Sequence, residues 1–186
     1  QTVFDLWADV QRQWVYLHGI FAGAGSEAMM HILPVESARF QSISSEFLAL
    51  LKKVLKAPYV LDVIAVPGIR ASLERLAELL HRIQTALGEY LERERGRFPR
   101  FYFVGDDDLL EMLGHGRDIA HASRHLSKMF AGLATVHADG TLIRAVETTA
   151  GERVELIAPV AVRDGMPVHE WLDALQNAIR TTLAHM

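Results

Sequence analysis

Apolar residues recur at steps of three and four along the first half of the chain, the spacing of amphipathic α-helices. The first run predicts a helix over residues 3–21, ended by Gly23-Ala24-Gly25. Its apolar positions are Val3, Trp7, Val10, Trp14, Leu17 and Phe21. A second run predicts a helix that begins near Pro34 and stops at Pro58. Its apolar positions are Phe40, Ile43, Phe47, Leu50 or Leu51, and Val54.

The third run is the most regular and predicts a helix from Ile69 to about Arg95, closed by Gly96 and Pro99. Its stripe consists of Ile69, Leu73, Leu76, Leu80, Ile83, Leu87 and Tyr90. An apolar seam of this length needs partner helices, which favours an intramolecular helical bundle. The alternative is a dimeric coiled coil, which usually needs about three to four heptads. The short apolar connector 59–66 stays unassigned.

After Pro99 the pattern changes, because proline forbids a continuing helix and the aromatic residues that follow favour an extended, largely buried segment over 98–103. Asp106, Asp107 and Asp108 then precede a short helix, closed by glycines at 114 and 116. One aspartate should be the N-cap, and the others suit the positive end of the helix dipole. Asp118 should cap another helix that runs to about residue 130.

From residue 134 the spacing indicates β-strands, with Asp139-Gly140 and Ala150-Gly151 between apolar runs. We predict a three-stranded antiparallel meander near residues 134–160, followed by a turn and a C-terminal helix that opens at Pro167. The fold class is therefore mainly α: an elongated multi-helix bundle with this small meander and a C-terminal helix. By element type the chain divides into a helical part, 1–133, and a part with the meander and last helix, 134–186.

Composition narrows the class of protein. The chain has 186 residues, 50% apolar and 23% charged, which is typical of a folded domain. Its net charge is −4, whereas nucleic-acid-binding domains usually show a basic excess. The longest uncharged stretch, 13–26, is shorter than the roughly 20 residues of a membrane-spanning helix. No leader is recognisable, and both ends read as interrupted helices, so we expect a piece of a longer cytosolic protein.

Catalytic motifs are largely missing from the sequence. Without cysteine there is no disulfide, thiolate nucleophile or cysteine-ligated zinc. We find no GxxxxGK[ST] phosphate loop, no HExxH and no GxSxG. Gly23-Ala24-Gly25 lacks the strand and third glycine of a dinucleotide loop. The sequence therefore predicts no nucleotide site, no cofactor and no catalytic residue within this chain.

Two clusters could hold a metal. His121 and His125 are four residues apart on a predicted helix, but Arg124 between them opposes a cation, so solvated histidines are the favoured interpretation. Asp106–Asp108 could bind magnesium or calcium, yet three adjacent carboxylates cannot all face one ion, so capping is favoured. The sequence therefore predicts no metal site.

Arginines alternate with glutamates near the end of the third helix. Arg93 and Arg95 are typical of a charged face with internal ion pairs. For Arg97 and Arg100 the same interpretation and a docking patch for an acidic protein surface both remain open.

The stretch YLERERGRFPRFYFVGDDDLLE (90–111) resembles a signature of dynein heavy chains, in the linker region that precedes their AAA+ ring. Three more stretches fit the same region in order: WVYLHGIFAG (14–23), LPVESARFQSISSEFLALLKKV (33–54) and HLSKMFAGL (125–133). The likeness is dense over 7–133, weaker through the β-rich part, and closer to cytoplasmic than to axonemal members. The stretch 23–31 departs most from the pattern.

The resemblance implies a mechanical function. The family's linker is a helical lever that bends and straightens over the AAA+ ring and converts ATP hydrolysis into movement toward microtubule minus ends. ATP and Mg would bind in the ring of the parent chain, an AAA+ ATPase motor, and not in this part. The implied partners are that ring, microtubules, a second heavy chain in a homodimer and associated dynein subunits, with no nucleic acid and no membrane insertion. The implied location is cytoplasmic, on the cytoskeleton, in intracellular transport.

The resemblance also directs attention to particular residues. We expect the signature to supply a structural core, made of Phe98, Pro99, Phe101, Phe103, Leu109 and Leu110. Charge and turn chemistry make four residues candidates for contacts with the ring: Arg97, Arg100, Asp139 and Gly151. Two rival functions are a free-standing helical protein–protein interaction adaptor, and a hydrolase or metal enzyme that uses the aspartates and histidines.

Overall fold

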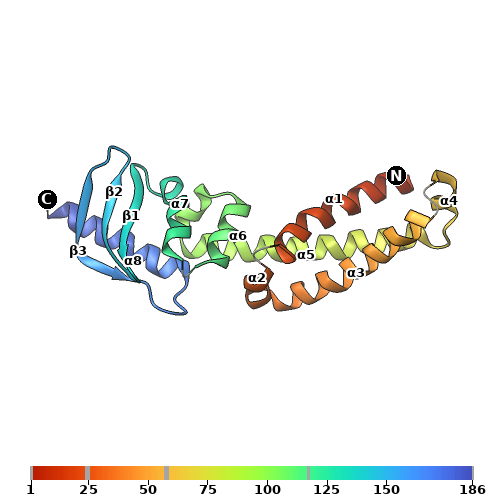
Figure 1. The fold of residues 1–186 in the computed structure, drawn as a ribbon, viewed down its shortest axis with the longest axis horizontal. Coiled ribbons are helices and arrows are strands. Elements are labelled where there is room, and N and C mark those ends of the chain that lie inside the picture. The colour runs from red at the N-terminus through yellow and green to blue at the C-terminus, as the bar shows by residue number, and fades with distance from the viewer. Residues whose placement is uncertain (1, 24–25, 57–58, 117, 186) are drawn as a thin grey trace. The chain divides into compact units, whose positions relative to one another are not determined.

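The computed structural model of the chain describes residues 2–23, 26–56, 59–116 and 118–185. It is mainly helical, with a three-stranded antiparallel sheet and a C-terminal helix, which confirms the predicted fold class (Figure 1). The helices are α1 (Val3–Phe21), α2 (Ser26–Ile32), α3 (Pro34–Lys56), α4 (Val60–Ala65), α5 (Ile69–Arg97), α6 (Asp106–Gly114), α7 (Ile119–Met129) and α8 (Val168–Ala184), with a 3₁₀ turn, η1 (Pro99–Phe103). The strands are β1 (Leu133–Asp139), β2 (Leu142–Thr148) and β3 (Arg153–Ala161).

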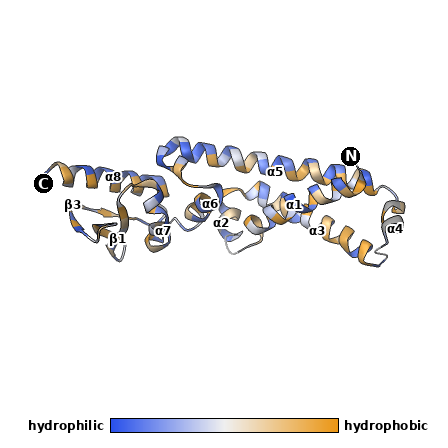
Figure 2. Cartoon of the chain, turned by 90° about the horizontal axis from the view of Figure 1, so that it is seen from above, coloured by the Kyte–Doolittle hydropathy of each residue, from blue (hydrophilic) through white to orange (hydrophobic). Residues whose placement is uncertain are grey.

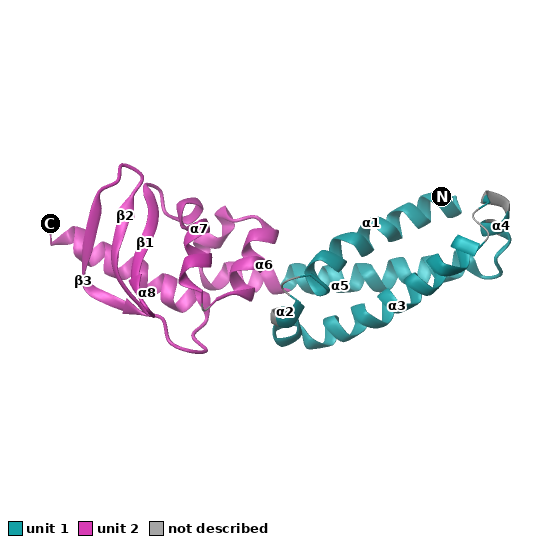
Figure 3. Cartoon of the chain, viewed as in Figure 1, with its two compact units in different colours: residues 1–89 teal, residues 90–186 magenta. Residues whose placement is uncertain are grey.

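The chain forms two compact units, unit 1 (residues 1–89) and unit 2 (residues 90–186), and α5 contributes residues to both (Figure 3). The boundary between the units, at residues 89 and 90, differs from the division by element type in the sequence analysis, which fell at residues 133 and 134. The reason is that α7 packs on β1 and α8 packs on β3, so the last helices and the sheet share one core. Within unit 2, helices and strands therefore stabilise each other.

Unit 1 buries the apolar stripes that the sequence predicts. Phe47 of α3 is fully buried, with ring centroids 5.3 Å from Trp14 and 5.9 Å from Trp7 of α1. The indole N–H of Trp14 also donates to Ser44 Oγ at 3.1 Å. Within the part of α5 that belongs to unit 1, the buried residues are Ile69, Leu73, Leu76, Leu80, Ile83 and Leu87. Both hydrophilic and hydrophobic residues follow one another along α5, as an amphipathic helix requires (Figure 2).

The short elements are where the local predictions are wrong or incomplete. The predicted extended segment 98–103 is a 3₁₀ turn, because Phe101 N–H donates to Phe98 O at 3.0 Å and proline suits the first position of a helix. Gly105, not an aspartate, is the N-cap of α6, so all three aspartates lie in its first turn. The helices α2 and α4 have no counterpart in the predictions. Ala24, Gly25 and Pro58, expected at helix ends, lie outside the described residues.

The sheet is the predicted meander, in the order β1-β2-β3. Its turns place glycines at positive φ, Gly140 at 60° and Gly151 at 79°, where other residues are strained. The pairing of β2 with β3 is irregular after Ile143, so β3 carries extra residues there. One of them, Ile157, donates its backbone N–H to Thr182 Oγ of α8 at 3.1 Å. The helix therefore replaces a hydrogen bond that the ladder cannot make.

Candidate functional site

The segment that resembles the family signature, residues 90–111, contains both buried and exposed side chains. Phe98 and Phe101 are buried and pack edge to face, with ring centroids 5.0 Å apart. Leu109 and Leu110 of α6 are buried as well. Phe103, however, is 70% exposed, against the expectation that it lies in the core.

The three residues per turn of η1 explain this difference. Phe98, Phe101 and Val104 are spaced by three and fall on one side, which is buried. Pro99 and Phe103 fall on other sides and are exposed. An alternating, extended segment would have buried Phe103 with Phe101, so the assumed secondary structure caused the error.

Arg100, a candidate ring contact, is bound within unit 2. Its Nε donates to Gln176 of α8 at 2.6 Å, and an Nη donates to the carbonyl oxygen of Met129 at 2.7 Å. Its guanidinium carbon lies 4.6 Å from the centre of the Phe130 ring, a cation–π geometry. Arg100 therefore ties η1 to α7 and α8.

Arg97, the second arginine candidate, is exposed but holds a buried partner. Its guanidinium lies 2.5 Å from the Glu94 carboxylate, which is only 6% exposed, and His169 Nδ1 of α8 lies 3.6 Å from the same carboxylate. Arg97 thus compensates the buried carboxylate of Glu94 as well as facing solvent.

The same part of α5 holds Tyr90. Burial, together with the nearby negative charge of Glu94, raises the pKa of Tyr90 to about 12.

The two turn candidates lie at opposite ends of the sheet. Asp139 is 80% exposed at the β1–β2 turn, and Gly151 is exposed at the β2–β3 turn (Figure 1). The seven residues of β2 separate these turns, a length of about 23 Å. At this separation, Asp139 and Gly151 would take part in two separate contacts with a partner and not in a single local one.

The helices α6 and α7 bring carboxylates and histidines together. His121 Nε2 lies 2.6 Å from Glu111 Oε1, and Lys128 donates to Asp108 Oδ2 at 2.7 Å. The Lys128 bond lowers the pKa of Asp108, although partial burial opposes this shift. His125 is 6% exposed, so the prediction of a solvated histidine is wrong here. Its outward neighbour Arg124 is exposed, and the amphipathic pattern of α7 turns His125 toward α6.

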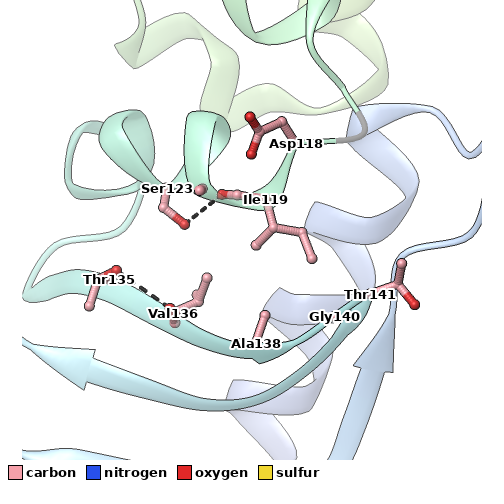
Figure 4. Close-up of a pocket in the computed structure, with 9 residues that line it drawn as sticks. Asp118, Ile119, Ser123, Thr135, Val136, Ala138, Gly140 and Thr141 are labelled. Atoms are coloured by element: carbon pink, nitrogen blue, oxygen red, sulfur yellow. Dashed lines mark hydrogen bonds between the residues drawn. The ribbon is translucent and has the colours of Figure 1, made fainter.

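A hollow of about 700 Å³ lies between the start of α7 and β1 (Figure 4). Several of its polar groups are already engaged: Asp118 accepts from the backbone N–H of His121 at 3.0 Å, which confirms the predicted cap. The hydroxyl of Ser123 donates to Ile119 O at 2.7 Å. The hollow therefore offers shape, but few free groups for chemistry.

Sequence reasoning missed Glu94 and Glu111. A signal existed for Glu94, because Leu87, Leu91, Glu94 and Phe98 continue the apolar stripe of α5 by steps of four, three and four. Glu111 has no such signal, since its role depends on the packing of α7 against α6. The interpretation of Arg95 as an ion-pairing residue is confirmed, with Glu92 at 2.9 Å and Asp106 at 2.5 Å.

Among the described residues, no helix is both long enough and apolar enough to cross a membrane.

Comparison with known proteins gives a consistent result. A family model described as "Dynein heavy chain, N-terminal region 2" matches residues 1–186. The chain is 51% identical over 187 residues to "Dynein heavy chain, cytoplasmic" of Drosophila melanogaster, and 52% identical over 186 residues to the protein of that name in Neurospora crassa. It is 48% identical over 186 residues to the Dictyostelium discoideum protein of that name. These matches cover 99–100% of this chain but only 4% of each relative.

Proposed function

This chain belongs to the dynein heavy chain family, and from that premise we propose that it forms part of the linker, the mechanical lever of a microtubule motor. The observation that carries the proposal is the family match, which extends over all 186 residues. In this proposal the parent chain is an AAA+ ATPase that binds ATP and Mg in its ring. It moves toward microtubule minus ends, as a homodimer with associated dynein subunits, in cytoplasmic transport along the cytoskeleton.

The architecture suits a part that carries load. The helix α5 has 29 residues, a length of about 43 Å, and keeps a buried face along most of that length. Close-packed interiors transmit strain because they are hardly compressible. The continuous buried face of α5, and not a reactive site, is the feature that this proposal needs.

Contact with the ring is proposed through exposed groups of unit 2. Arg97 and Asp139 have charged side chains that reach solvent, and the Gly151 turn lies at the other end of the sheet. Arg100 would act indirectly, because its donors are engaged by Gln176 and Met129. These contacts are tested by measuring hydrogen exchange in the parent motor and in a form of it that lacks the ring. A site whose protection is the same in both would be excluded as a contact with the ring.

The lever itself is tested by interrupting α5 in the parent motor. Gly88→Pro breaks the helix at an interior position, since proline removes an N–H and clashes with the preceding turn. The matched control is Gly88→Ala, because a Cβ at this position meets no atom within 4 Å. ATP turnover and microtubule gliding speed are measured together on both variants. We expect the proline variant to retain turnover and lose gliding, while the alanine variant retains both.

Melting of the 186-residue chain with each substitution serves as the folding control. A proline variant that folds and glides at the unmodified speed would show that continuity of α5 does not transmit movement.

A further inference from the structure

The acidic residues and the histidine that meet between α6 and α7 are not explained by the proposed lever function. Asp108, Glu111 and His125 each offer one ligand atom, and these atoms all lie within 4.8 Å of one another. Two of the residues come from α6 and one from α7, so a bound ion would join the helices. Carboxylate oxygens together with an imidazole nitrogen form a donor set that zinc and its neighbours in the periodic table accept.

His125 supplies the independent observation. Its side chain is more than nine-tenths buried, and within the described residues neither of its ring nitrogens has a hydrogen-bond partner. A buried polar group is normally satisfied by protein, water or an ion. The ring faces the two carboxylates, with Nδ1 3.6 Å from Asp108 Oδ1 and Nε2 3.6 Å from Glu111 Oε2.

The distance of 3.6 Å is long for a hydrogen bond but suits two ligands of one ion. Ligands bound tetrahedrally at about 2.0–2.2 Å lie about 3.3–3.6 Å from each other. A single ion takes only one ring nitrogen, so only one of the two 3.6 Å distances can join ligands of that ion. The three ligand atoms lie within 4.8 Å of one another, and the second carboxylate has to move closer to reach the ion.

The charges around the cluster also favour a cation. The carboxylates of Asp108 and Glu111 both lie beside His125, and Lys128 occupies only the Oδ2 oxygen of Asp108, which leaves Oδ1 turned toward His125. His121 holds the other oxygen of Glu111, the usual position of a group that orients a ligand.

We propose that Asp108, Glu111 and His125 form a binding site for a divalent transition metal, with His121 as a positioning residue for Glu111. The metal fastens α6 to α7 within unit 2. This proposal does not depend on the linker function, because it concerns only the binding properties and stability of this chain.

The test uses the 186-residue chain, freed of metal with a chelator and then titrated with zinc. We expect about one zinc to bind per chain in equilibrium dialysis, together with a rise in the melting temperature. Cobalt(II) in place of zinc should give the visible absorption of a tetrahedral site. His125→Gln and Glu111→Gln should each weaken zinc binding by at least about tenfold, and His121→Gln by about tenfold.

The matched control is His137→Gln on the sheet. His137 Nε2 also lies 2.7 Å from a carboxylate, that of Glu147, but among the described residues this pair has no third ligand beside it. The control should bind zinc as the unmodified chain does. Because Glu111 is 43% exposed, its variant keeps the test decisive even if loss of His125 unfolds the chain.

Two results would overturn the proposal. One is that the unmodified chain binds no zinc at micromolar concentrations, so that the cluster is a set of ion pairs only. The other is that a folded Glu111→Gln variant binds zinc as tightly as the unmodified chain.

Discussion

Unit 1 and unit 2 are stabilised in different ways. In unit 1 most ion pairs join residues of the same helix, three or four positions apart, as Glu78 and Arg82 do. In unit 2 important polar contacts join residues far apart in sequence: Arg100 with Gln176, Asp108 with Lys128, and Ile157 with Thr182. A helical seam can therefore be recognised from local spacing, whereas the second unit depends on contacts that no local pattern contains.

The largest effect should come from the aromatic residues of η1. The sequence predicts that both Phe101 and Phe103 are buried, and this prediction is wrong for Phe103. Phe101→Ala should lower the free energy of unfolding by about 3–5 kcal/mol, since it empties a fully buried position. Phe103→Ala, two residues later, should change it by less than about 0.5 kcal/mol, because that ring is 70% exposed. Urea unfolding of both variants measures the difference. Equal losses would mean that Phe103 is buried in solution.

Charge reversal compares the two units directly. Arg97→Glu places a second carboxylate beside the buried Glu94 and should cost about 1–3 kcal/mol of stability. Arg82→Glu in unit 1 faces the exposed Glu78 and should cost no more than about 1 kcal/mol. The same unfolding measurement applies to both. If the two losses were equal, Glu94 would be hydrated and the contrast between the units would fail at this position.

Two glycines give a third comparison. Gly116→Ala should destabilise unit 2 by about 1–3 kcal/mol, because a Cβ there would lie 2.6 Å from Val168 Cγ2, a short side chain with little freedom to move. Gly88→Ala on α5 should instead stabilise by about 0.5–1 kcal/mol, since the position is helical and open. Thermal unfolding of both variants gives the sign of each change. A neutral Gly116→Ala would show that α8 can shift to make room.

The last effect should appear only in alkali. Burial raises the pKa of Tyr90 to about 12, so the neutral phenol is favoured in the folded state. This stabilisation is complete below the unfolded pKa of about 10 and is lost as the pH rises through the folded value. Stability measured from pH 8 to 12 should therefore fall more steeply in the unmodified chain than in Tyr90→Phe. Parallel curves would mean that the ring is solvated.

These contrasts show why some features could be predicted and others could not. The helices that became α1, α3 and α5 follow from apolar spacing alone, and the meander follows from glycine turns between β-forming runs. The position of Phe103 depended on whether residues 98–103 are extended or a 3₁₀ turn, which a proline followed by aromatics does not decide. The burial of His125 depended on the packing of α7, which places the residue between Asp108 and Glu111. Positions fixed by pairs of elements need the tertiary structure.

The irregular pairing in β3 has a consequence for self-association. A three-stranded sheet has two edges, and an unpaired edge is a template on which other copies can add strands and aggregate. Here the exposed edge strand carries Pro159, which has no N–H to offer, and the N–H of Ile157 is already taken by Thr182. Charged residues, Arg153 and Glu155, stand at the start of the same strand. An incoming strand would thus find the β3 edge a poor partner.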